Sequence, residues 1–294
     1  MTYKVVHPAS GDQMTTTEGS IGNPVETPRI GLAIWTRLGP RGRNSVAGVV
    51  GTVAFLLIWQ LISVSGLLHR DALPPALATI ANAFRLLTDT QFLANVGSTL
   101  WASLVGFAWA AIIAVPLGLV LGLSRQLYSL TSTVMELLRP LPPVAFVPLL
   151  VLTVGQSLEM KASVIVIGCV WPLLTNTIHG VHSTDPTARA TGQSFGWNRF
   201  QLLYRVVWPS AVPSVLTGVR ITTSIALVLC VGAEFIGGSP TGLGSWLLQQ
   251  SLLPDSLQAV AAGVIVAGML GLIVNAAVST LEKRFAQWAR RQDS

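Results

Sequence analysis

The sequence predicts an all-α membrane protein with six transmembrane helices, and two observations lead to this fold class. Hydrophobic residues make up 51% of the 294 residues, charged residues only 10%, and the mean hydropathy is +0.62. Such a chain has too little charge to cover a surface exposed to water, so lipid is its natural solvent. In addition, long runs without charge approach or exceed the roughly 20 residues that a helix needs to cross a hydrocarbon core.

The composition divides the chain into three parts. Residues 1–45 are polar, rich in Thr, Gly and Pro, and not followed by the short apolar core and cleavage site of a secretory signal peptide. We expect them to form a disordered cytoplasmic tail. The transmembrane domain covers residues 46–281, and a second cytoplasmic tail covers residues 282–294.

Four of the six expected spans are free of charge. They are residues 46–68, 90–124, 162–180 and 256–281. In the second of them small residues recur at steps of four, which predicts a face on which another helix packs closely. These residues are Gly106, Ala110, Ala114, Gly118 and Gly122.

The third span, residues 130–154, contains ionisable groups and several prolines. Glu136 and Arg139 lie three positions apart, and this spacing on one helix predicts a structural ion pair. Pro140, Pro142, Pro143 and Pro148 remove helical N–H donors and predict kinks. Irregular backbone at membrane depth is tolerated only against protein or a water-filled cavity, so we expect Pro143 and Pro148 to face a pathway.

The fifth span, residues 214–237, carries Arg220 and Glu234. We expect Arg220 to extend to the membrane interface. Glu234 lies near the outer end of this span, next to the glycine-rich sequence FIGGSPTGLG. Two roles remain open for Glu234, because it can line the exit of a pathway or anchor the glycine-rich segment.

The distribution of Lys and Arg predicts the orientation, because loops on the cytoplasmic side retain positive charge. With the N-terminus inside, nearly all basic residues lie on or near the cytoplasmic side, and only Arg70, Arg85 and Lys161 lie outside. Both termini and the loop 184–213 are then cytoplasmic. The net charge of +6 is thus a signal of topology, and the chain has no soluble basic domain that would bind nucleic acid.

The loop 184–213 is polar, basic and rich in helix-breaking residues. Thr184 or Asp185 can cap a helix whose first turn contains Pro186. This helix is expected to end near Phe195, where Gly196 permits a backbone conformation that a Cβ disfavours. A second helix is expected over residues 198–207, with its end at Trp208 and Pro209.

This loop resembles the EAA loop of ABC-transporter permeases. In that motif E-A-A is followed by a glycine four residues later and by a leucine-proline pair farther on. Here Ala190, Thr191 and Gly192 stand at the E-A-A positions, Gly196 at the glycine and Pro209 at the proline, so the acidic residue is absent. Further segments in family order resemble the nitrate, sulfonate and taurine branch. They are residues 73–87, 98–125, 138–155, 233–244 and 281–288.

The resemblance implies the permease subunit of an ATP-driven importer in the bacterial inner membrane, with the type I importer fold. Its implied partners are two ATPase subunits docked at the loops, a second permease copy, an extracytoplasmic binding protein and membrane lipid. The solute would be a small oxyanion or organic molecule such as nitrate, a sulfonate or taurine. We expect the ATPase to contact a loop face that includes Phe195, Trp197 and Phe200.

The sequence offers little for catalysis, and no cofactor is expected. A P-loop needs lysine after glycine, whereas Lys4, Lys161 and Lys283 follow Tyr, Met and Glu. His179 and His182 share a helix face, but only Asp185 is near enough to add a metal ligand, so we expect no metal site. A secondary transporter is the main alternative, although neither midplane acids nor inverted repeats are found. A membrane enzyme ranks third for lack of a catalytic constellation.

Overall fold

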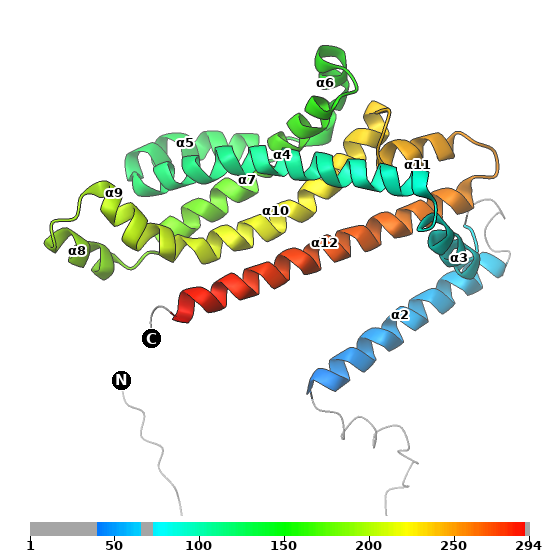
Figure 1. Cartoon of the computed structure of the whole chain (residues 1–294), viewed down its shortest axis with the longest axis horizontal. Coiled ribbons are helices and arrows are strands. Elements are labelled where there is room, and N and C mark those ends of the chain that lie inside the picture. Colours follow the sequence, from blue (N-terminus) through cyan, green and yellow to red (C-terminus); the bar gives the residue numbers. More distant parts are fainter. Residues whose placement is uncertain (1–39, 66–72, 292–294) are drawn as a thin grey trace, which may run out of the picture. The chain divides into compact units, whose positions relative to one another are not determined.

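A computed structural model describes residues 40–65 and 73–291 of the chain (Figure 1). The described elements are all helical. They are α2 (Pro40–Val64), α3 (Ala76–Leu86), α4 (Thr90–Leu123), α5 (Arg125–Leu138), the 3₁₀ helix η1 (Pro143–Phe146), α6 (Val147–Val154), α7 (Leu158–His182), α8 (Pro186–Ser194), α9 (Arg199–Leu202), the π-helical η2 (Leu203–Val207), α10 (Trp208–Gly237), α11 (Leu243–Ser251) and α12 (Leu257–Arg291).

The chain separates into two units, residues 1–55 and 56–294. The described part of the first unit is the beginning of α2, which starts at Pro40 and therefore extends into the predicted tail. The remainder of that tail lies outside the described residues. In the second unit, the end of α2 is tied to the start of α3, because Trp59 Nε1 donates to the Pro74 carbonyl at 3.1 Å and Ser63 Oγ to the Leu73 carbonyl at 2.9 Å.

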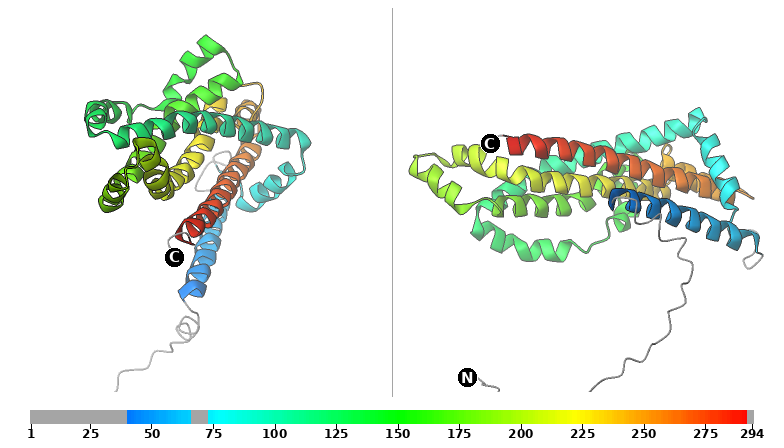
Figure 2. Two further views of the ribbon diagram at one scale, coloured as in Figure 1. Left: turned by 60° about the vertical axis from the view of Figure 1, so that its left-hand side comes forward. Right: turned by 90° about the horizontal axis from the view of Figure 1, so that it is seen from below.

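Helices α4, α7 and α10 form the core of the second unit, and α12 lies along α10 (Figures 1 and 2). The predicted small-residue face of α4 is confirmed, since all five of its residues are buried. A Cβ added at Gly118 would lie 2.6 Å from Thr177 Cβ of α7, and one added at Gly122 would lie 2.7 Å from Val181 Cβ. Close approach of the two helices therefore depends on these glycines.

The third predicted span is broken rather than kinked. Its two halves, residues 125–138 and 143–154, meet at an angle of 76°. Pro142 and Pro143 lie at the break, where neither offers an N–H to continue the helix, and Pro143 begins η1. A kink was predicted at Pro148, but the chain does not bend there. Pro148 lies in the first turn of α6, where a backbone N–H would have no helical hydrogen-bond partner.

The described residues contain five helices long and apolar enough to cross a membrane, or six if the broken pair is one span. This matches the six expected spans. The α12 helix continues to Arg291, through the predicted C-terminal tail, because the sequence LEKRFAQWARR contains neither Gly nor Pro.

Candidate functional site

The first half of the predicted loop forms a short capped helix. The Asp185 carboxylate accepts a hydrogen bond from the Thr187 N–H at 2.8 Å, and Pro186 occupies the first helical position of α8. Ala190 and Thr191 are exposed on α8, whereas Gly192 is buried. A Cβ at Gly192 would lie 2.8 Å from both Trp197 Cε3 and Leu202 Cδ1. The glycine at this position thus lets the two helices of the loop meet.

The turn between α8 and α9 requires glycine. Gly196 has a φ of +73°, as the sequence predicted, and no atom would meet an added Cβ within 4 Å. The free-energy cost of a side chain at this position therefore comes from the backbone conformation and not from a steric collision. Asn198 and Gln201 then form a capping box that starts α9.

The aromatic residues of the loop have two different environments. Trp197 is half-buried, and the Arg205 guanidinium lies 5.2 Å from the centroid of its ring. Phe195 and Phe200 are 73% and 82% exposed. Tyr204, which the sequence analysis missed, is 75% exposed and follows Phe200 by one helical turn. The exposed aromatic residues of the loop, here called its aromatic face, are Phe195, Phe200 and Tyr204, and the Trp197 ring lies 6.2 Å from that of Phe195.

The predicted end of the second helix at Pro209 is wrong. Helical structure continues from Arg199 to Gly237 without a break. Pro209 stands at the start of α10, and the π-helical turn η2 immediately before it accommodates the lack of an N–H. The loop is consequently continuous with a membrane span.

A buried ion pair lies at the opposite end of α7 and α10 from this loop. Lys161 Nζ and Glu234 Oε1 are 2.9 Å apart, and their side chains are 4% and 0% exposed. Glu234 Oε2 accepts hydrogen bonds from Thr99 Oγ1 at 2.8 Å and from the Gly244 N–H at 3.0 Å. Lys161 also donates to the Thr241 carbonyl at 2.7 Å. Both charges are therefore paired and hydrogen-bonded, as burial requires.

The same cluster holds the glycine-rich segment. The Gly242 N–H donates to Asn95 Oδ1 at 2.8 Å, and the Leu243 N–H donates to Thr99 Oγ1 at the same distance. Gly242 has a φ of +132°, and a Cβ there would collide with the Glu234 carboxylate. Of the two roles left open for Glu234, this geometry favours anchoring of the segment.

Other predicted residues lie apart from these two sites. The Glu136–Arg139 ion pair is not formed in the described residues, because Arg139 Nη2 instead donates to Thr175 Oγ1 of α7 at 3.3 Å. Arg220 pairs with Glu282 of α12 at 3.5 Å. Pro143 packs on Gly168 of α7, whereas Pro148 is exposed.

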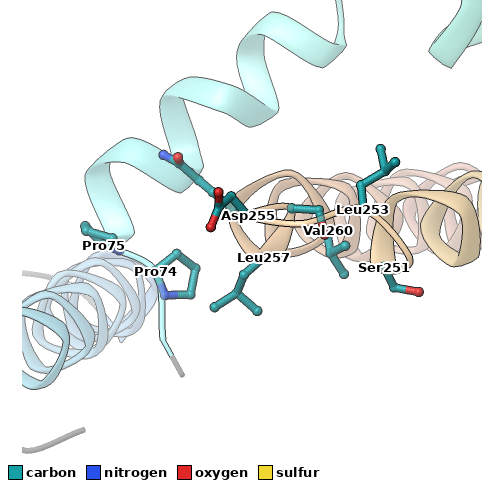
Figure 3. A pocket seen from close by; sticks show the side chains of 9 residues that line it. Pro74, Pro75, Ser251, Leu253, Asp255, Leu257 and Val260 are labelled. Atoms are coloured by element: carbon teal, nitrogen blue, oxygen red, sulfur yellow. The ribbon is translucent and has the colours of Figure 1, made fainter. Parts of the chain in front are cut away.

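A cavity of about 600 Å³ opens at the end of the second unit far from the α8–α9 loop. Pro74 and Pro75, before α3, lie opposite Asp255 and Leu257 at the turn between α11 and α12 (Figure 3). Asp255 has a φ of +57°, an uncommon conformation for a residue with a side chain.

The spans, the broken helix and the exposed helical loop are those of a multi-pass membrane protein. The chain belongs to the family of binding-protein-dependent transport system inner membrane components, whose model matches residues 114–287. The chain is therefore a multi-pass permease of an importer that works with an ATPase and a binding protein, and the family gives no support to the secondary-transporter alternative.

Two relatives and one solved structure illustrate this membership. The bicarbonate transport system permease protein CmpB of Synechococcus elongatus is 30% identical over 84% of this chain and 87% of its own length. The taurine transport system permease protein TauC of Escherichia coli is 29% identical over 81% of this chain and 88% of its own. A chain of the MetNI methionine ABC transporter, solved in inward-facing conformations, has 17% identity and a TM-score of 0.58, and covers 66% of this chain and 95% of its own. The predicted fold is thereby confirmed.

Proposed function

We propose that this permease forms half of the translocation pathway for a small oxyanion or small organic solute, such as nitrate, a sulfonate or taurine. The relatives named for bicarbonate and taurine support this class, since both solutes are small and carry an oxyanion. The sequence features that place the chain in the nitrate, sulfonate and taurine branch give the same class.

The α8–α9 loop is the proposed docking element for the ATPase. The observation that carries this proposal is the exposed aromatic face of Phe195, Phe200 and Tyr204 on two short helices fixed by the turn at Gly196. A soluble protein surface rarely exposes clustered large aromatic residues unless they bind a partner. Asp185, Ala190, Thr191, Gly192 and Pro209 shape the loop around this face, and the absent acid of the E-A-A motif would stand at the exposed position 190.

A second copy of the permease is proposed to complete the pathway. No residue of α5 is buried in the single chain, and Leu130, Leu137 and Leu152 on the two halves of the broken span are 76%, 69% and 85% exposed. A twofold axis would bring two such faces together or expose them jointly to a central pathway. Pro143, Pro148 and the rest of the broken span would then lie beside it.

The proposed orientation places both termini and the α8–α9 loop in the cytoplasm and the Asp255 turn outside. The positive charge of the loop supports this arrangement, because Arg189, Arg199 and Arg205 all belong to it. ATP hydrolysis is proposed to reside on the two ATPase subunits alone, since none of the three lysines follows a glycine.

Reconstitution of the permease with its ATPase tests this function. The substitutions Phe200→Ser and Tyr204→Ser should each reduce co-purification of the ATPase by about tenfold or more, because an aromatic residue that anchors an interface as a hot spot contributes about 2 kcal/mol or more. Leu252→Ser, which alters a residue 76% exposed at the other end of the molecule, is the matched control. The isolated permease should hydrolyse no ATP. Retention of the ATPase by both aromatic variants, or ATP turnover by the permease alone, would contradict the proposal.

A further inference from the structure

A cavity of about 660 Å³ lies where the α4–α5 junction meets the α8–α9 loop. Both elements are at the same end of the helices (Figure 1). The volume is within the range of small-molecule sites in proteins. Arg125 comes from the start of α5, Arg189 from α8 and Arg199 from α9, and all three line the cavity. No acidic residue is among the lining residues of this cavity.

The three arginines are not neutralised within the described part of the chain. Neither ion pair of that part involves them. Arg189 donates through Nη2 to the Val181 carbonyl, yet its Nε is buried and has no hydrogen-bond partner. A buried donor without a partner is costly, and a cluster of guanidinium groups repels itself. An anion in the cavity would offset the repulsion among these guanidinium groups.

The start of α5 adds to this positive potential. Ser124, Arg125 and Gln126 line the cavity at the N-terminus of a 14-residue helix. Ser124 Oγ already accepts from the Leu127 N–H, but the remaining N–H groups and the helix dipole favour a negative charge at such a position. The N–H donors of an arginine guanidinium group have a geometry that matches the oxygens of a phosphate group.

One side of the cavity is apolar and faces outward. Val120, Leu123 and Leu127 line it and are 53%, 43% and 42% exposed. They belong to the end of a membrane span and the beginning of α5. The cavity therefore combines basic groups with an apolar wall, and an acyl chain can lie along that wall.

We propose that this cavity binds the phosphate headgroup of an anionic phospholipid at the end of α4. Basic cavities between membrane helices bind such headgroups. The inference rests on the membrane insertion of the chain and does not depend on which solute is transported. A free phosphate ion has the same charge chemistry but would make no use of the apolar wall.

Titration of the purified full chain in detergent with phosphatidylglycerol, followed by native mass spectrometry, tests this site. The wild-type chain should retain one phosphatidylglycerol in preference to phosphatidylcholine. The double variant Arg125→Gln/Arg199→Gln should bind it about 25-fold more weakly, because each arginine near an anionic lipid contributes roughly fivefold. Both side chains are exposed and make no hydrogen bond in the described residues, so the variant should fold.

The double variant Lys283→Gln/Arg284→Gln is the matched control, because it removes the same charge from an exposed position outside the cavity. It should bind within about twofold of the wild type, since surface charges outside the site contribute little. Equal loss in both double variants, or equal retention of the two lipids by the wild type, would overturn the proposal. Competition by inorganic phosphate at the affinity of the lipid would assign the cavity to a free anion. If the Arg125→Gln/Arg199→Gln variant lost association with the ATPase and the wild type showed no lipid preference, the arginines would be assigned to a protein partner.

Discussion

At the scale of single residues, the backbone at Gly196 is the most constrained point of the loop. Its φ is +73°, and an added Cβ would meet no atom within 4 Å. A substitution at this position therefore tests backbone strain without a steric collision. Gly196→Val should lower ATPase-coupled transport strongly, because a β-branched residue in this conformation costs of order 1–3 kcal/mol and the turn will distort. Gly196→Asn should retain most transport, because asparagine tolerates a positive φ. Uptake of labelled taurine or nitrate by proteoliposomes measures both, with membrane expression as the control.

A companion substitution tests the missing acid of the motif. Ala190 is exposed on α8. Ala190→Glu should therefore leave the fold unchanged, and ATPase docking should stay equal or become stronger. A clear loss of docking at normal expression would show that position 190 does not play the role of the family's acidic residue.

The Lys161–Glu234 pair makes a second prediction at this scale. Lys161→Met should lower stability by about 3–5 kcal/mol, because Glu234 would then be a buried charge without a partner. The double variant Lys161→Met/Glu234→Gln should recover part of that loss. Glu282→Gln is the control, because it breaks the partly exposed pair with Arg220 and should cost no more than about 1 kcal/mol. Thermal unfolding in detergent measures all three. Equal losses in Lys161→Met and Glu282→Gln would contradict this account.

The ionisable residues also show where prediction from the sequence ends. Glu136 and Arg139 have the right spacing for a pair, but spacing within one helix ignores the neighbouring helix, and Arg139 reaches Thr175 instead. Lys161 and Glu234 are 73 positions apart, so nothing local joins them. Only the observation that a membrane lysine requires an acid could have suggested the pairing.

At the scale of helices, the α4–α7 contact was the most predictable feature, because close packing leaves a sequence pattern of small residues at steps of four. Gly118→Ala should destabilise the protein by about 1–3 kcal/mol, since its Cβ would lie 2.6 Å from Thr177 Cβ. Gly97→Ala on the same helix meets open space and should be neutral or stabilising. Unfolding midpoints of the two variants measure the difference, and equal midpoints would refute the packing argument.

Proline was a weaker guide at this scale. It marked the break between α5 and η1, but it wrongly predicted an end at Pro209 and a bend at Pro148. The π-helical turn before Pro209 takes up its missing N–H inside a continuous helix, whereas Pro148 is accommodated because it lies in the first turn of α6. The sequence alone does not say where that first turn begins.

At the scale of the whole molecule, the charge distribution predicts which ends of the helices face the cytoplasm. Ser194→Cys in α8 and Ser251→Cys in α11 are conservative changes at exposed positions. A membrane-impermeant maleimide should label Ser251→Cys in intact cells and Ser194→Cys only after permeabilisation. Cys169 and Cys230 are 0% exposed, so the wild-type chain should give little background. Labelling of both variants from the same side would refute the six-span topology.

The buried ion pair also has a consequence for the order in which the protein is made. During synthesis α7, with Lys161, is made before α10, which carries Glu234 73 positions later. Insertion of a lysine at the centre of a span costs roughly 3 kcal/mol. Lys161, however, lies in the first turn of α7, so its side chain can extend to the membrane interface until α10 is in place. Its final burial then requires α10 and the glycine-rich segment together. A chain truncated before residue 234 should therefore keep this lysine at the membrane surface.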